Sequence, residues 1–148
     1  MSKNKGFSIT SADRYSLALY ELASENNVLS QVEEQSLSIL DLISSSRDFL
    51  NVIKDPTNNQ DNLLKVINRI SNDNKLDNLL KNFLSFLITK RRFFYVEQIL
   101  KSFIETCSQK RGELKAELKS AKELSSDEIS KITDELTKNF SSKIKLNY

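Results

Sequence analysis

Residues 75–90 read KLDNLLKNFLSFLITK, and this stretch decides the fold class. Its apolar residues recur at the three- and four-residue spacing of an α-helix. One broad face holds Leu76, Leu80, Leu84, Leu87 and Ile88, and a second face holds Leu79, Phe83 and Phe86. A helix that is apolar on nearly every side has to be surrounded by other elements. The stretch therefore predicts the central helix of a mainly α-helical fold.

The composition of the chain agrees with a helical fold. Its 148 residues include only two glycines and one proline, so few positions interrupt a helix. Hydrophobic residues make up 39% and charged residues 28%, which is typical of a folded chain and not of a disordered one. This length suits one compact domain, or one domain with a small appendage.

The same periodicity predicts further helices before residue 111. We expect them at residues 12–26, 28–44, 47–53, 58–70 and 93–110, with the central helix at 75–90. Ser46 is expected to cap the short helix at 47–53, and Pro56 to end it.

The first of these helices, at residues 12–26, is also apolar on two sides. Leu17 and Tyr20 lie nearly opposite its main apolar stripe. That stripe consists of Ala12, Tyr15, Ala18, Leu19 and Leu22. One side of such a helix can fill the core of a bundle. The other side can take an amphipathic partner helix, which is recognised through anchors one turn apart.

The pattern changes after Gly112. Residues 113–120, ELKAELKS, alternate as in a strand, yet Glu, Leu, Lys and Ala are strong helix formers. The pattern alone leaves both structures open. The capping box SSDE at 125–128 opens a helix predicted at 127–140. Residues 143–148, KIKLNY, alternate cleanly and indicate a strand.

The residue types that most catalytic sites need are missing. The chain has no histidine, which removes the commonest general base and most zinc sites. Its one cysteine, Cys107, lies one turn beyond Phe103 and is predicted to be a small buried hydrophobe. The carboxylates lie mostly on polar helix faces beside lysines. We therefore expect no catalytic residue, no metal site and no cofactor.

Charge and hydropathy argue against nucleic acid and bilayer as partners. The 22 basic and 20 acidic residues are interspersed, and the only dense basic cluster, at 90–92, is interpreted as a basic helix end facing the macrodipole. No apolar run approaches the ~20 residues that span a bilayer. The first residues also lack the apolar segment of a signal peptide. We expect a cytoplasmic protein that meets a membrane only through a partner.

Two stretches of the helical part match the pattern of a known family. Residues 14–23 read RYSLALYELA. The family pattern at this place is Tyr-Ala-x-Ala-Leu, followed by an aromatic residue, two further residues and Ala. This chain departs from the pattern at Ser16, where Ala is usual. Residues 82–92, NFLSFLITKRR, correspond to a helix that usually closes in Asn-x-Arg. Arg92 matches that ending, while Lys90 departs from Asn.

The chain as a whole resembles the delta subunit of F-type ATP synthases, the family called oligomycin-sensitivity-conferring protein (OSCP) in mitochondria. Residues 49–56 resemble its short third helix, and residues 122–147 resemble its second half. The resemblance implies a six-helix bundle over residues 1–110 and a small α/β (βαβ) region over 111–148, which favours the strand at 113–120. The family normally continues with a Gly-Gly strand and a final helix, so we expect this α/β region to be truncated.

The resemblance also implies a function without catalysis. The family is a stator subunit of the peripheral stalk, which links the catalytic head to the membrane sector and resists rotor torque during proton-driven ATP synthesis. Its bundle holds the N-terminal helix of an alpha subunit, and its C-terminal region binds the b subunits. It lies on the cytoplasmic side of the cell inner membrane, as a peripheral part of the complex.

The family places the alpha helix between its first and fifth helices. The residues expected to contact that helix here are Tyr15, Ala18 and Phe86, with Leu22, Leu79 and Phe83 as neighbours by helical spacing. Core packing is the alternative role for each of them. The alternative function is that of a generic helical protein–protein adaptor outside the synthase.

Overall fold

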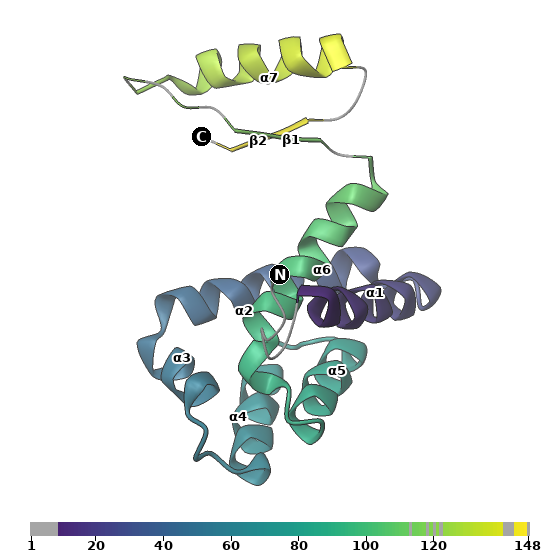
Figure 1. Cartoon of the computed structure of the whole chain (residues 1–148), viewed down its shortest axis with the longest axis vertical. Coiled ribbons are helices and arrows are strands. Elements are labelled where there is room, and N and C mark those ends of the chain that lie inside the picture. Colours follow the sequence, from purple (N-terminus) through teal and green to yellow (C-terminus); the bar gives the residue numbers. More distant parts are fainter. Residues whose placement is uncertain are drawn as a thin grey trace, which may run out of the picture. The chain divides into compact units, whose positions relative to one another are not determined.

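The computed structural model describes residues 9–112, 114–117, 119, 121, 123–140 and 144–147 (Figure 1). Contacts between Cα atoms divide the chain into two compact units, Met1–Thr106 and Cys107–Tyr148. The described residues are mainly α-helical, which confirms the predicted fold class at this level. Some positions of the predicted strands lie outside the described residues: 113, 118, 120, 143 and 148.

The described part of the first unit is built from helices joined by short turns (Figure 1). They are α1 (Ile9–Glu25), α2 (Leu29–Ser45), α3 (Arg47–Lys54), α4 (Gln60–Asp73), α5 (Asn78–Thr89), the 3₁₀ turn η1 (Phe93–Tyr95) and α6 (Val96–Lys110). The last turn of α6 belongs to the second unit. Helix α1 begins three residues before the predicted start, and the Ser46 hydroxyl caps α3 by accepting the Phe49 N–H (3.2 Å).

The central helix α5 starts later than the periodicity predicts. Lys75 has a φ of 50°, in the left-handed region, so the helix cannot include it. The Asp77 carboxylate instead caps α5 by accepting the N–H of Leu79 (2.8 Å). The Asp77 N–H in turn donates to Oε1 of Gln35 on α2 (2.8 Å). The start of α5 is thereby tied to a neighbouring helix.

The helix predicted at 93–110 is interrupted at its beginning. Arg91 has a φ of 58°, and the Arg92 N–H donates to the Leu87 carbonyl (2.8 Å), which closes the end of α5. The chain then makes the tight turn η1 before α6 begins at Val96. Phe93 in this turn is buried, so its side chain holds the junction of α5 and α6 in the core.

Helix α5 buries its main apolar face, as predicted, although Leu76 of the predicted face precedes the helix and is half-buried. Its main apolar face is at most 1% exposed and consists of Leu80, Leu84, Leu87 and Ile88. Ile99, Leu100 and Phe103 of α6 are fully buried as well. The second apolar face of α5 is split, because Phe83 is buried while Phe86 is 45% exposed.

The predicted apolar stripe of α1 is two stripes in the structure. The buried one consists of Ala12, Ser16, Leu19 and Ala23. Tyr15, Ala18 and Leu22 form a second stripe beside it, and Leu17 is 42% exposed. Buried Ser16 is compatible with the core because its hydroxyl donates to the Asp13 carbonyl and pairs with the Ser102 hydroxyl of α6, both at 2.9 Å.

The second unit contains β1 (Leu114–Glu117), α7 (Ser126–Phe140) and β2 (Ile144–Asn147). The two strands pair in parallel with Leu114 opposite Ile144, and α7 contacts β2 (Figure 1). The predicted capping box is confirmed: Ser125 N–H donates to the Glu128 carboxylate (2.8 Å), and Glu128 N–H donates to the Ser125 hydroxyl (3.3 Å). Cys107 is fully buried, also as predicted.

We expect Leu84→Ala to lower the free energy of unfolding by about 2–5 kcal/mol, because it leaves a cavity beside a side chain that is 1% exposed. Urea unfolding followed by circular dichroism measures the loss. The matched control is Leu37→Ala on α2, whose side chain is 47% exposed and whose truncation should cost less than about 1 kcal/mol. Equal losses for the two variants would contradict the central position of α5.

Candidate functional site

A groove of about 790 Å³ lies between α1 and α5. All six residues that the sequence predicted as partner contacts line it: Tyr15, Ala18 and Leu22 from α1, and Leu79, Phe83 and Phe86 from α5. The rest of the lining is Asn26, Val28, Asp77, Asn78 and Asn82. The structure therefore brings the predicted residues together, and their role in binding stays a prediction.

The α1 wall of the groove is open to a partner. Ala18 is exposed, Leu22 is 46% exposed and Tyr15 is half-buried. Their spacing of three and four residues places them on one face of the helix, apart from the stripe that enters the core. A small residue between two larger ones leaves room for the backbone of a partner to approach.

The three apolar side chains of the α5 wall differ in how much of their surface is exposed. Phe83 is 7% exposed, so it belongs to the core as well as to the groove, and core packing accounts for most of its surface. Leu79 is half-buried, and Phe86 is 45% exposed. Among these three, Phe86 has the most surface left for a partner to cover.

Two aromatic rings connect the walls. The centroids of Tyr15 and Phe86 lie 6.4 Å apart, with their planes tilted by 56°. This is a favourable geometry for an aromatic pair. The ammonium group of Lys90 lies 5.7 Å from the Phe86 centroid, within range of a cation–π interaction. Both contacts favour the positions that the two rings have in the structure.

The polar side chains at one end of the groove are tied to helix ends. The Asn26 amide donates to the Leu22 carbonyl at the end of α1 (2.7 Å), and the Asp77 carboxylate caps the start of α5. The sequence pattern did not predict this polar rim, which Asn78 and Asn82 complete. Asparagine and aspartate are common at helix ends for local reasons, so the sequence carries no separate signal for a groove.

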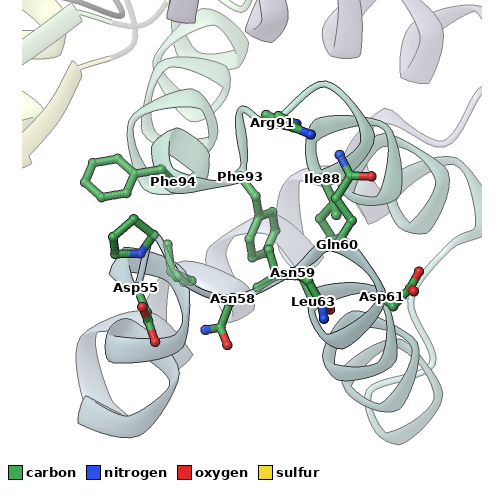
Figure 2. Close-up of a pocket in the computed structure, with 12 residues that line it drawn as sticks. Asp55, Asn58, Asn59, Gln60, Asp61, Leu63, Ile88, Arg91, Phe93 and Phe94 are labelled. Carbon is green, nitrogen blue, oxygen red and sulfur yellow. The ribbon is translucent and has the colours of Figure 1, made fainter.

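A second cleft, of about 640 Å³, lies between the α3–α4 loop and the α5–η1 junction (Figure 2). Its polar side chains brace the neighbouring backbone. Asn58 donates to the Val52 carbonyl (3.0 Å), and Gln60 donates to the Thr89 carbonyl (3.2 Å). The polar side chains of this cleft therefore serve the packing of the neighbouring helices.

Asp55 at this cleft has a perturbed carboxyl group. The pKa of Asp55 is lowered from its ordinary value, first by the Thr57 hydroxyl, which donates to the carboxylate (2.6 Å), and then by the Thr57 N–H (2.8 Å). The cause is that both hydrogen bonds favour the charged form. Asp55 is exposed and both hydrogen bonds come from Thr57, so this carboxylate stabilises a turn before α4.

Neither a metal centre nor a membrane span is found in the part of the chain that the structure describes. No group of three or more His, Cys, Asp or Glu side chains gathers there at metal-binding distance. None of the helices described is both long and apolar enough to cross a bilayer.

The model of the ATP synthase delta (OSCP) subunit family matches residues 12–148. The chain belongs to this family. A protein named ATP synthase subunit delta from Pelagibacter ubique (strain HTCC1062) is 68% identical over 148 residues, which is 100% of this chain and 80% of that protein. A protein of the same name from Rhodospirillum rubrum is 32% identical over 138 residues, covering 93% of this chain and 74% of that protein.

A solved structure shows the same fold. It is a chain in the cryo-EM structure of the Toxoplasma gondii mitochondrial ATP synthase hexamer, with a TM-score of 0.76 and 23% sequence identity. The similarity covers 93% of this chain and 77% of that chain. At this identity the likeness establishes the fold and adds no residue roles.

Membership of the delta (OSCP) family confirms the predicted class of function. The chain is a stator component of the peripheral stalk of ATP synthase and a non-catalytic subunit. Its partners are other subunits of the synthase, and it is a peripheral part of that complex. The alternative of an adaptor outside the synthase is therefore not supported.

We expect Thr57→Ala to raise the pKa of Asp55 toward its ordinary value, because the larger of the two hydrogen bonds that favour the carboxylate is lost. Thr57→Ser is the matched control, since it retains the hydroxyl. In the wild type the lowered pKa adds stability above the pKa of the unfolded chain, and this stability is lost as pH falls through the folded value. NMR titration of the Asp55 carboxyl carbon measures the shift, and identical midpoints in both variants would disprove the assignment.

Proposed function

We propose that the groove between α1 and α5 holds the N-terminal helix of an alpha subunit of the catalytic head. The observation that supports this is the pairing of two apolar rows along one groove. Tyr15, Ala18 and Leu22 form the first row, and Leu79, Phe83 and Phe86 form the second. Successive residues of each row are about one helical turn apart, which is the spacing of the anchors when an amphipathic helix lies in a groove.

The exposure of the groove residues suits a tight joint. Leu22 and Phe86 are each nearly half exposed, so a partner helix can bury the remainder of both side chains. Large apolar anchors in such interfaces cost about 2 kcal/mol or more when they are truncated. A stator joint under torque needs slow dissociation, and a nanomolar Kd corresponds to about −12 kcal/mol. A few anchors of this size supply a substantial part of that free energy.

The two parts of the chain have separate partners in this proposal. Residues 1–110 form the bundle that binds the catalytic head, and residues 111–148 form a partial βαβ region that binds the b subunits of the stalk. The parallel pairing of β1 with β2, which α7 connects, supports the βαβ part of this assignment. Binding of the b subunits by this region is supported by apolar side chains on α7 that are only half-buried and can be covered further: Ile129, Ile132 and Leu136.

The mechanical role follows from having two binding surfaces on one chain. Rotor torque would turn the catalytic head unless a stator holds it to the membrane sector. A chain that binds the head through its groove and the stalk through its second unit transmits this resisting force. Its place would be the cytoplasmic side of the inner membrane, where it meets the membrane only through the complex.

Substitution Ala18→Asp should abolish binding of a synthetic alpha N-terminal peptide, because it places a charge where the partner backbone approaches. Tyr15→Asp should act in the same way. Ser24→Asp adds the same charge to an exposed position of α1 outside the groove lining, so it should bind like the wild type. Titration calorimetry measures the affinity and circular dichroism the helical content. Unchanged affinity in Ala18→Asp would rule out the groove, and global unfolding would favour core packing at these positions.

The division of labour between the two units can be tested on the whole chain by hydrogen exchange. The alpha peptide should slow amide exchange in residues 15–22 and 79–86, because binding suppresses local opening there. The soluble part of the b subunits should slow exchange in α7 and in the paired strands, and leave the groove helices unchanged. Protection of the groove by the b subunits would contradict this assignment.

A further inference from the structure

Two exposed leucines on α1 and α2 lie outside the groove. The large apolar side chains that are at least 42% exposed among the described residues are Leu17, Leu22, Leu37, Phe86 and Phe94. Leu22 and Phe86 line the groove, and the ring of Phe94 lies 4.2 Å from the ammonium group of Lys54. Leu17 and Leu37 line neither the groove nor the second cleft, so their exposure has a separate explanation.

Helices α1 and α2 repeat one side-chain pattern twenty residues apart. The buried residues of α1 are Ala12, Ser16, Leu19 and Ala23, and those of α2 are Val32, Ser36, Ile39 and Ile43. The exposed leucines follow the same rule, since Leu37 is the equivalent of Leu17. So do half-buried Tyr20 with Leu40 and the exposed carboxylates Glu21 with Asp41. Each helix therefore has the same arrangement beside its buried stripe.

The repeated residues face the seam between the two helices. On α1 the groove residues lie to one side of the buried stripe, and Leu17 and Tyr20 lie to the other. Helix α5 takes the groove side, while α2 also packs against α1 and runs back along it after a short turn (Figure 1). Antiparallel helices that turn equivalent stripes to the core also turn equivalent sides to each other. We call the surface made by these residues the outer seam: Leu17, Tyr20, Glu21, Leu37, Leu40 and Asp41.

The outer seam belongs to the most acidic stretch of the first unit. The charged residues between Arg14 and Arg47 are all acidic: Glu21, Glu25, Glu33, Glu34 and Asp41. The chain as a whole has a net charge of +2, so negative charge is concentrated on this pair of helices. Glu21 and Asp41 each lie one turn beyond an exposed leucine. Among the described residues these two carboxylates form no ion pair.

We propose that the outer seam binds a basic amphipathic helix of another subunit of the synthase. The apolar side of that helix covers Leu17 and Leu37, and its Lys or Arg side chains lie beside Glu21 and Asp41. Charge selects this occupant, because an acidic surface repels both a second copy of itself and an anionic bilayer. Apolar anchors with charges around them are the arrangement that combines affinity with specificity in such contacts.

A contact at the outer seam would add a second attachment to the first unit. It lies on the other side of α1 from the groove, so a helix at the seam and a helix in the groove can be bound together. Two attachments on one body are released more slowly than either alone, because the second keeps the first at a high effective concentration. The inference does not depend on what the groove binds.

The first experiment locates the binding of a defined probe on the full chain. The probe is a synthetic amphipathic helix of leucine and lysine, and its counterpart has glutamate in place of lysine. NMR shifts of backbone amides should be largest for residues 33–41 of α2, which contribute nothing to the groove lining. Shifts confined to residues 79–86 would place the probe in the groove and overturn the proposal. Equal binding of the glutamate peptide would overturn the role of charge.

The second experiment removes the apolar and the acidic parts of the seam separately. Leu17→Gln/Leu37→Gln should weaken binding of the lysine peptide by about tenfold or more, because both anchors are lost. Glu21→Gln/Asp41→Asn should weaken it by about two- to tenfold at low salt. Most of this second effect should disappear at about 0.5 M salt, where charges are screened over a few ångströms. Titration calorimetry measures both, and an unchanged affinity in either variant would contradict the seam.

Asp134→Asn/Glu135→Gln on α7 is the matched control, because it removes two exposed carboxylates outside the outer seam. It should bind the lysine peptide like the wild type. A loss equal to that of Glu21→Gln/Asp41→Asn would mean that net charge alone attracts the peptide, which also overturns the proposal.

The third experiment identifies the natural occupant in the assembled synthase. A photoreactive benzoylphenylalanine in place of Leu37 is cross-linked by light, and mass spectrometry identifies the attached peptide. The expected product joins this position to a helical segment of another subunit that carries an excess of Lys and Arg. A product with an acidic segment, with lipid or with a second copy of this chain would overturn the proposal, and so would the absence of any product. The alpha peptide can still bind the groove in each of these cases, so the two functions fail separately.

Discussion

Burial of the main face of α5 is the constraint on which the first unit depends. Leu80, Leu84, Leu87 and Ile88 are at most 1% exposed, so neighbouring helices have to close around this face completely. The hydrophobic effect stabilises each such side chain by about 1.5–3 kcal/mol relative to its exposure in water. The cap at Asp77 and the reversal at Arg91 limit α5 to the length that this core can cover.

The groove follows from what α5 and α1 leave uncovered. Both helices carry a second apolar row, and the bundle uses only part of it. Phe83 is drawn into the core, whereas Phe86 and Leu22 stay nearly half exposed. This uncovered apolar surface is what the proposed partner helix would bury.

A stator joint needs surface and rigidity more than reactive chemistry. The described residues hold no cluster of metal ligands, and the chain has no histidine. What the structure does provide is a set of positioned rings and capped helix ends, such as the Tyr15–Phe86 pair. Because these groups are ordered by the fold, binding of a partner helix, as proposed, would cost the groove little conformational freedom.

The sequence by itself determined the helices, the buried main face of α5, the caps at Ser46 and Ser125, and the burial of Cys107. Each of these follows from local periodicity or from hydrogen bonds between residues close in sequence. Through the family pattern and helical spacing, the sequence also named six of the eleven residues that line the groove.

Only the tertiary structure decided that Tyr15 and Ala18 line the groove with Phe86, apart from the stripe of α1 that is buried. Periodicity shows which residues share a face of one helix, but it does not show which neighbour covers that face. The closeness of the Tyr15 and Phe86 rings depends on the packing of α1 against α5, which the burial of the other faces of the two helices sets.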